Sequence, residues 1–168
     1  QAVEYAQSKG VTIVAAVGNE GMRGVAFPAR YEGVIGVTSI DANGNVSRFS
    51  NYGEGVDLGA PGVGVYSAWA EDGMVAFSGT STASAFVAGA LAAEFSKNTG
   101  KPREETVDLL YQYANEAEKP GFDQYTGHGA LNVGRIENRY NPYLTDAAIV
   151  GYYFDPEDFG KPEVPFLV

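Results

Sequence analysis

The sequence predicts an α/β fold with a mostly parallel β-sheet and helices on both faces. Two segments, 11-VTIVAAV-17 and 34-VIGVTSI-40, are continuously apolar and rich in β-branched residues. Such runs are typical of strands that are buried on both faces of a sheet. Segments with helical periodicity alternate with these strands, and this alternation favours parallel pairing with helical connections.

The remaining elements follow in chain order. Apolar residues recur at helical spacing over 2–9, and Gly10 ends that pattern. A third short strand is expected at 56–60, closed by Pro61 and Gly62. Further helices are expected over three segments, namely 81–97, 102–114 and a short stretch after Asn132.

Composition bounds the class of protein. A chain of 168 residues is long enough for one domain with a hydrophobic core. The net charge of −10 disfavours nucleic acid and anionic membrane surfaces as partners. The absence of cysteine excludes disulfides, thiol catalysis and cysteine metal sites. No apolar run reaches the length of a membrane span, and no signal peptide is present.

The two ends of the chain also carry information. The sequence opens without Met in the middle of a helical pattern, so we expect it to be the interior of a longer protein. From Tyr140 onward the composition turns rich in Pro, aromatic and acidic residues. We therefore divide the chain into a domain portion, 1–140, and a tail or linker, 141–168.

One serine stands at the start of an unusually apolar segment, 78-SGTSTASAFVAGALAAEF-95. A helix beginning there would place Ser81 beside unpaired N–H groups and partial positive charge, where an oxyanion is stabilised. Gly79 would let the backbone turn tightly and give a substrate room to approach. The alternative is an ordinary N-cap serine with no chemical role.

Asn19 lies just past the C-terminal end of a buried strand, in 14-VAAVGNEG-21. Ligands of open α/β sheets bind at that edge. An amide there can donate a hydrogen bond to an oxygen without a competing proton equilibrium. Taken alone, however, an Asn after Gly is ordinarily a turn residue.

Taken together, these segments resemble the C-terminal half of a subtilisin-like serine protease, a subtilase. The resemblance rests on 79-GTSTASAFVAG-89 and 16-AVGNEG-21, with 27-FPARYEGVIGVTSID-41, 47-SRFSNYG-53 and 57-DLGAPG-62 between them and 126-TGHGALNVGRIE-137 after them. It covers roughly residues 1–140. It implies that only the C-terminal part of the subtilisin-like fold is present, and that the Phe27–Pro28 peptide bond is cis.

The resemblance implies roles for individual residues. Ser81 would be the nucleophile that forms an acyl-enzyme, and the Asn19 side chain and the Ser81 N–H would form the oxyanion hole, which Thr80 supports. The residues implied in the pocket before the scissile bond are Ala16, Val17, Gly18, Glu20 and Ala26. Those implied elsewhere along the substrate are Gly79 at the nucleophile and Phe49 and Phe77 on the leaving-group side.

The general base is the missing part. In subtilases the triad runs Asp, His, Ser along the chain, so the Asp and His would precede Gln1. The only histidine is His128, at a position that is variable in the family, and we expect it to be a surface or turn residue. The resemblance thus implies a secreted, extracellular endopeptidase acting on polypeptides, whose isolated C-terminal half is inactive, associates with itself and needs its N-terminal half. The alternative is a non-catalytic subtilase-like domain used for binding or assembly.

No cofactor is expected to be required. The family resemblance does imply a structural cation site made by the carbonyls of Ala29, Tyr31 and Val34, with the Asp57 carboxylate nearby. Oxygen-only ligation suits Ca²⁺ or a monovalent ion such as Na⁺. A family carboxylate near Asp57 is replaced by Gly55, with Glu54 as a stand-in, and an empty loop is the alternative.

Overall fold

A computed structural model describes residues 1–70 and 73–140. Its centre is a three-stranded parallel sheet in the order β1-β2-β3. The strands are β1 (Ile13–Ala16), β2 (Val34–Ile40) and β3 (Leu58–Pro61). Val14 of β1 lies opposite Ile35 of β2, and Val37 of β2 lies opposite Leu58 of β3. All seven residues of β2 are buried, as expected for the strand in the middle of a covered sheet.

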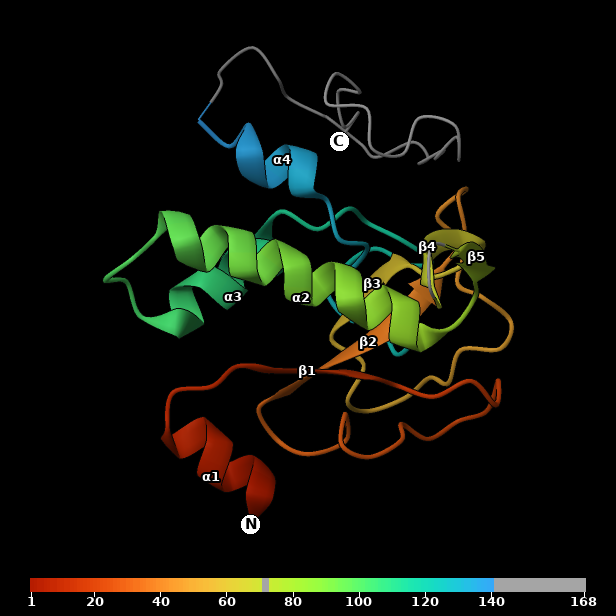
Figure 1. The fold of residues 1–168 in the computed structure, drawn as a ribbon, viewed down its shortest axis with the longest axis horizontal. Coiled ribbons are helices and arrows are strands. Elements are labelled where there is room, and N and C mark those ends of the chain that lie inside the picture. Colours follow the sequence, from red (N-terminus) through yellow and green to blue (C-terminus); the bar gives the residue numbers. More distant parts are fainter. Residues whose placement is uncertain (71–72, 141–168) are drawn as a thin grey trace.

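The described residues form four helices, which lie on both sides of this sheet or pack on a helix that does (Figure 1). They are α1 (Ala2–Ser8), α2 (Thr80–Lys97), α3 (Arg103–Gln112) and α4 (Val133–Glu137). Helix α2 is the longest and contacts all three strands, while α3 packs against α2 and α4. The sheet therefore receives its main cover from the helix that carries Ser81.

Alternate residues of β2 feed two separate hydrophobic clusters. Ile35 and Val37 pack with residues of α2, α3 and α4, including Val87 and Leu110. Val34 packs in the other cluster, against which Val3 of α1 lies. Because side chains alternate across a strand, the two clusters occupy opposite faces of the sheet. The α/β fold with helices on both faces is thus confirmed.

The predicted element boundaries hold with small shifts. Strand β2 has the predicted bounds, whereas β1 is shorter than the predicted 11–17 and β3 begins two residues later than the predicted 56–60. The Phe27–Pro28 bond is cis, as the resemblance implied. The predicted tail, 141–168, lies outside the described residues.

One element was not predicted. Strands β4 (Val65–Trp69) and β5 (Gly73–Phe77) form an antiparallel hairpin. Every residue of the two strands except Val65 is at least partly exposed. Because the segment packs little of its surface into a core, it lacks the apolar run or regular alternation by which a buried strand is detected.

Helix α2 is apolar on all sides, which predicts burial all round. The structure buries one stripe, made of Thr80, Ala83, Val87, Leu91 and Glu94. A second face is exposed and consists of small apolar residues, namely Ala85, Ala88, Gly89, Ala92 and Ala93. Beside it, β1 has β2 as its one strand neighbour among the described residues. The helix and the sheet thus both have an uncovered side.

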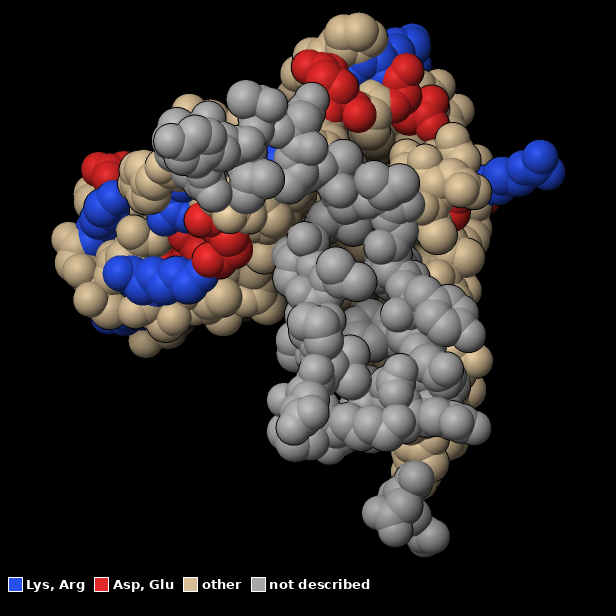
Figure 2. Space-filling view, turned by 90° about the horizontal axis from the view of Figure 1, so that it is seen from above, with Lys and Arg blue, Asp and Glu red and all other residues tan. Residues whose placement is uncertain are grey.

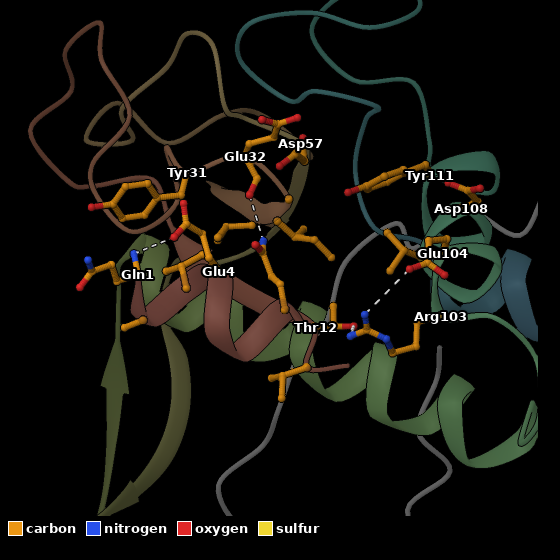
Figure 3. Close-up of a pocket in the computed structure, with 18 residues that line it drawn as sticks. Gln1, Glu4, Thr12, Tyr31, Glu32, Asp57, Arg103, Glu104, Asp108 and Tyr111 are labelled. Atoms are coloured by element: carbon orange, nitrogen blue, oxygen red, sulfur yellow. Dashed lines mark hydrogen bonds and ion pairs between the residues drawn. The ribbon is translucent and has the colours of Figure 1, made fainter. Parts of the chain in front are cut away.

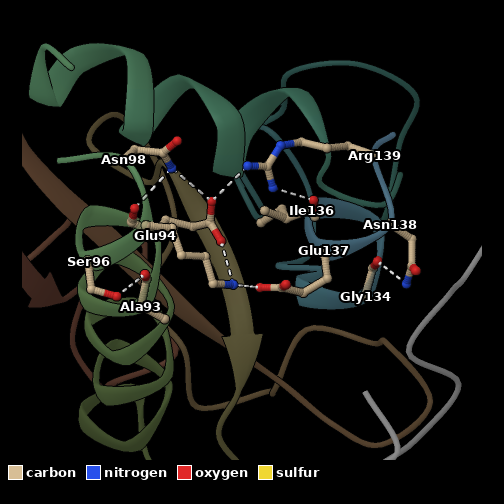
Figure 4. Close-up of polar contacts among 10 residues, drawn as sticks. Ala93, Glu94, Ser96, Asn98, Gly134, Ile136, Glu137, Asn138 and Arg139 are labelled. Carbon is tan, nitrogen blue, oxygen red and sulfur yellow. Dashed lines mark hydrogen bonds and ion pairs between the residues drawn. The ribbon is translucent and has the colours of Figure 1, made fainter. Parts of the chain in front are cut away.

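The C-terminal end of α2 is joined to the end of α4 by charged groups (Figure 4). Glu94 is 2 % exposed. Its carboxylate lies 3.2 Å from Lys97 Nζ and 3.3 Å from Arg139 Nη2, and it accepts a hydrogen bond from the Asn98 amide at 3.2 Å. Lys97 also pairs with Glu137 of α4. On the face shown in Figure 2, most of the charged side chains lie in groups that contain both acidic and basic residues.

Candidate active site

Ser81 lies where the carboxyl ends of the strands meet the start of α2. Gly62 follows β3, and its carbonyl accepts a hydrogen bond from the Gly79 N–H at 2.8 Å. Asn19 follows β1, with Val17 and Gly18 between them. Segments about sixty residues apart in sequence are therefore brought together at the edge where ligands of parallel sheets bind.

Asn19 is held by Thr80, the first residue of α2. The side-chain oxygen of Asn19 accepts hydrogen bonds from the N–H and from the hydroxyl of Thr80, both at 2.9 Å. The Thr80 hydroxyl in turn accepts one from the Gly18 N–H at 3.3 Å. A backbone N–H can only donate, so the Asn19 atom facing it must be the oxygen. The NH₂ end of Asn19, which has no acceptor among the described residues, is therefore available to a ligand.

The space beside that NH₂ group is left open by Gly79. A Cβ placed on Gly79 would lie 3.7 Å from Asn19 Nδ2 and 3.9 Å from the Ser81 backbone nitrogen. The two donors thus border one small space, and Ser81, which is exposed, stands next to it. Two N–H groups that border one space at an exposed serine are the donors needed to stabilise an oxyanion in acyl transfer.

The loop that carries Asn19 is organised by a buried residue, Asn51. Its side-chain oxygen accepts hydrogen bonds from the N–H groups of Glu20 at 3.1 Å and Met22 at 3.2 Å. Its NH₂ donates to the Glu20 carboxylate at 2.6 Å, and its backbone N–H donates to the Gly18 carbonyl at 3.0 Å. Sequence reasoning gave Asn51 no role, although it lies within the matched segment 47–53.

Comparison with known proteins agrees with this geometry. The chain matches the Subtilase family (Peptidase_S8) over residues 1–129. The chain belongs to the subtilase family.

Individual relatives show how far the similarity extends. The chain is 42% identical over 133 residues to alkaline elastase YaB from Bacillus sp. (strain YaB), covering 79% of this chain and 34% of that protein. It is 39% identical over 133 residues to subtilisin BL from Lederbergia lenta, covering 79% and 48%. The chain thus spans between a third and a half of the length of these relatives.

Solved structures give the same match. The prenylagaramide maturation protease PagA superposes with a TM-score of 0.69 at 30% identity, over 79% of this chain and 51% of that one. A lanthipeptide protease superposes with a TM-score of 0.75 at 23% identity, over 83% and 54%, which supports the fold. In the part of the chain that the structure describes, no helix is both long and apolar enough to cross a membrane.

Most of the predicted pocket residues of this subtilase lie around the Asn19 loop. Glu20 is exposed and held by Asn51, and Ala16 and Gly18 are half-buried. Ala26 donates its N–H to the Val17 carbonyl at 2.8 Å. Val17 is fully buried in the core, and its N–H and carbonyl are bonded to Val37 and Ala26, so this residue supports the loop from within.

The two predicted leaving-group residues come from different places. The Phe49 carbonyl accepts the Gly21 N–H, which ties Phe49 to the Asn19 loop. Phe77 lies on β5, four residues before Ser81. Both side chains are half-buried, so each keeps some surface for a ligand.

His128 lies far from Ser81. Its N–H donates to the Asp57 carbonyl at 2.9 Å, and its ring stacks on Tyr111 with centroids 4.2 Å apart. Asp57 precedes β3, whereas Gly62, which bonds to Gly79, follows it. At roughly 3.3 Å of rise per residue, the five steps from 57 to 62 separate the two ends by about 16 Å. A general base must lie within about 3 Å of its nucleophile, so His128 is not placed to serve Ser81.

Three of the four predicted cation residues, Tyr31, Val34 and Asp57, border a pocket of about 880 Å³ between α1 and α3, whereas Ala29 does not line it. Figure 3 shows Tyr31 and Asp57 on one side of it and Tyr111 and Asp108 on the other. The Tyr31 carbonyl accepts the Val34 N–H at 3.1 Å, and Asp57 Oδ2 accepts the Gly36 N–H at 2.7 Å.

Five carboxylate side chains line this pocket, those of Glu4, Glu32, Asp57, Glu104 and Asp108. Burial raises the pKa of Asp57, although the Gly36 N–H and the nearby His128 act in the opposite direction. A Cβ on Gly55 would lie 3.7 Å from the Ala29 carbonyl oxygen. A carboxylate at position 55 would therefore add an oxygen ligand close to this carbonyl, which Gly55 lacks. Within 1–70 and 73–140, no three acidic, His or Cys side chains converge to hold a metal. The cation site therefore stays a prediction.

Proposed function

We propose that this protein is a serine endopeptidase in which Ser81 attacks the peptide carbonyl. The observation that carries the proposal is the open space bordered by the Asn19 amide and the Ser81 N–H, at the exposed residue Ser81. The Ser81 oxygen bonds to the carbonyl carbon as its proton passes to a base. The carbonyl oxygen becomes an oxyanion that accepts from the two donors. The amine then leaves with the proton, and water hydrolyses the acyl-enzyme.

The base in this scheme is a histidine, oriented by an aspartate, on an N-terminal half of the catalytic domain. Two features support this. The chain spans 34% and 48% of the two relatives named above, and its apolar surface is uncovered along β1 and α2. A hollow of about 320 Å³ lies there, with Val14, Ala88 and Ala92 among the residues that line it. An added strand pairing with β1 and side chains packing on α2 would cover both.

Three further statements belong to the proposal. The whole protein acts on polypeptides outside the cell, in line with the proteases that it resembles. The carbonyls of Ala29, Tyr31 and Val34, with Asp57, hold a structural Na⁺ or Ca²⁺. The chain without its N-terminal half is inactive and associates through its open strand edge and apolar helix face.

A fluorophosphonate probe tests the catalytic proposal. The chain is compared alone and joined to an N-terminal half that carries Asp and His. We expect labelling of Ser81 in the joined protein and its loss in Ser81→Ala, with His128→Ala labelled at the parent rate. Labelling at another residue would refute the nucleophile assignment. A joined protein that is folded but neither labelled nor active would favour the non-catalytic alternative.

Association of the chain alone is tested by sedimentation at micromolar concentration. We expect oligomers that dissociate when the N-terminal half is supplied. A stable, compact monomer would contradict the proposed open surface.

A further inference from the structure

One face of the β4–β5 hairpin carries apolar side chains, of which two are exposed and one is half-buried. The register pairs Val65 with Phe77, Ser67 with Val75 and Trp69 with Gly73. Side chains alternate along a strand, so these residues share one face. Trp69 is the only tryptophan in the sequence; it is 60% exposed and Val75 is 36% exposed. We call Trp69, Val75 and Phe77 the hairpin face.

The two rings of this face form a continuous surface. Trp69 lies opposite Gly73, four residues from Phe77 along β5, which is about 13 Å of backbone. The ring centroids of Trp69 and Phe77 are nevertheless only 5.5 Å apart, with planes tilted by 52°. The indole therefore lies back along the hairpin toward Phe77. A tryptophan held against a second aromatic, yet mostly exposed, is typical of a binding surface rather than of a core.

The hairpin face is continuous with the candidate active site. From Phe77 the chain passes through Ser78 and Gly79 directly into α2 and Ser81. The hairpin lies beside the beginning of α2 (Figure 1). Each strand of the hairpin is paired only with the other in the described part of the chain, so its edges are open to an extended peptide. A substrate that reaches Ser81 thus has an apolar, strand-like surface immediately beside it.

We propose that Trp69 determines specificity on the leaving-group side of the scissile bond, by binding an apolar side chain two residues beyond the one that Phe77 contacts. The spacing supports this, since alternate side chains of an extended peptide are roughly 7 Å apart and the two ring centroids are 5.5 Å apart. The proposal rests on the proposed endopeptidase function. The preferred substrates would be polypeptides that carry two apolar residues, with one residue between them, on the C-terminal side of the bond that is cut.

The first test measures binding without catalysis. In the Ser81→Ala chain all tryptophan emission comes from Trp69. The probes are four-residue peptide amides that correspond to the leaving product. One peptide is all alanine, others carry a single Phe, and others carry two Phe residues with one alanine between them. We expect a saturable blue shift, with the doubly substituted peptide binding about tenfold more tightly than the all-alanine peptide. The proposal would be overturned if no peptide changed the Trp69 emission, or if all the peptides bound with equal affinity.

The second test measures hydrolysis by the protein that carries its N-terminal catalytic half. Trp69→Ala is compared with Tyr66→Ala, a matched control because Tyr66 is 39% exposed but lies on the other face of the same strand. We expect Trp69→Ala to lower kcat/KM about tenfold for substrates that carry the favoured apolar residue. The variant should then no longer prefer Phe over Ala at that position. Tyr66→Ala should keep that preference. An unchanged preference in Trp69→Ala, or its loss in both variants, would refute the role.

Two outcomes separate this inference from its alternatives. A peptide ester has no amino-acid residue on the leaving side, so its cleavage does not depend on Trp69. Cleavage of this ester that is lost in Ser81→Ala therefore tests the catalytic function alone. If that cleavage fails while the peptides still shift Trp69 emission in the expected order, the proposed function falls and the peptide-binding face stands. If Trp69→Ala instead dissociates oligomers of the chain and no peptide competes, the face is a contact between copies and the inference is wrong.

Discussion

A methyl group on Gly79 would lie 3.7 Å from the side-chain amide nitrogen of Asn19. Gly79 has φ 161°, an extended backbone that alanine also adopts, so Gly79→Ala adds bulk without backbone strain. The added carbon would occupy the space in which the oxyanion is expected to form. We predict that kcat of the joined protein falls on the order of 10²-fold, comparable to losing one oxyanion donor, with little change in the midpoint of thermal unfolding.

Gly89→Ala is the matched control for the stability of the chain alone. Gly89 lies in α2 on its exposed face, and a Cβ there meets nothing within 4 Å. Alanine in a helix interior is favoured over glycine by about 1 kcal/mol, so the chain with Gly89→Ala should unfold at a slightly higher temperature than the parent chain. Activity of the joined Gly79→Ala protein equal to that of its parent would mean that the space beside Asn19 is not used in the reaction.

Thr80 offers a finer test of the same site. Its hydroxyl donates to Asn19 and accepts from Gly18, so Thr80→Val keeps the shape and removes both hydrogen bonds. A neutral hydrogen bond contributes about 1 kcal/mol. We predict that Thr80→Val lowers kcat up to about tenfold with KM nearly unchanged, and that Thr80→Ser, which keeps the hydroxyl, is close to the parent. A Thr80→Val effect confined to KM would indicate disturbed substrate binding instead.

The sequence predicted the parts of this site that follow from local pattern. The buried run 34–40 is visible because burial on both faces leaves a continuous apolar stretch, and Ser81 is visible because it opens an apolar helical segment two residues after Gly79. The placement of Asn19 at the end of β1 followed from the parallel sheet and from the family resemblance. None of this required knowledge of distant contacts.

What the sequence did not predict depends on contacts between distant segments. Asn51 looks like any polar loop residue, and its role comes from three bonds to residues about thirty positions away. The β4–β5 hairpin was not predicted because its exposed strands show little alternation of apolar and polar residues. Glu94 stands in an apolar helix as an apparent exception, and Arg139, which makes its burial tolerable, lies 45 residues further along the chain.

Asp57 provides a prediction on pH and cations. Burial raises the pKa of its carboxyl above the ordinary value of 3.8. The folded state therefore holds this proton more tightly than the unfolded state does, and the free energy of unfolding decreases as pH rises from about 3.8 through the folded pKa. Asp57→Asn, whose oxygen can still accept from Gly36, should remove that decrease. Denaturant titrations of both proteins across this range, without Na⁺ or Ca²⁺, measure the difference.

The proposed cation should reverse this effect. An ion at the carbonyls near Asp57 favours the ionised carboxylate, so adding Na⁺ or Ca²⁺ at neutral pH should stabilise the parent more than Asp57→Asn. Tetramethylammonium chloride at equal ionic strength is the control for salt screening. Equal stabilisation of both proteins by all three salts would argue against a cation site that includes Asp57.

The Glu94–Arg139 pair makes the last prediction, which concerns stability. Glu94 and Arg139 have side chains that are 3% and 11% exposed, 3.3 Å apart. Removing one partner leaves the other charge buried with fewer compensating groups, so Arg139→Leu should lower the free energy of unfolding by about 3 kcal/mol. Glu104→Ala is the control, because Glu104 is 77% exposed and lies 3.9 Å from Arg103; a surface pair of that kind contributes at most about 1 kcal/mol.

The double variant Glu94→Leu/Arg139→Leu completes a thermodynamic cycle measured by urea unfolding. Glu94 lies on the buried stripe of α2 with Leu91, so a leucine there extends an apolar surface. Replacing a buried ion pair with apolar residues is often neutral or stabilising. The double variant should therefore regain most of the stability that Arg139→Leu loses, with a coupling free energy of about 2 kcal/mol or more. Additive losses from the two single changes would instead show that Glu94 and Arg139 act independently and that the pair does not join α2 to the end of α4.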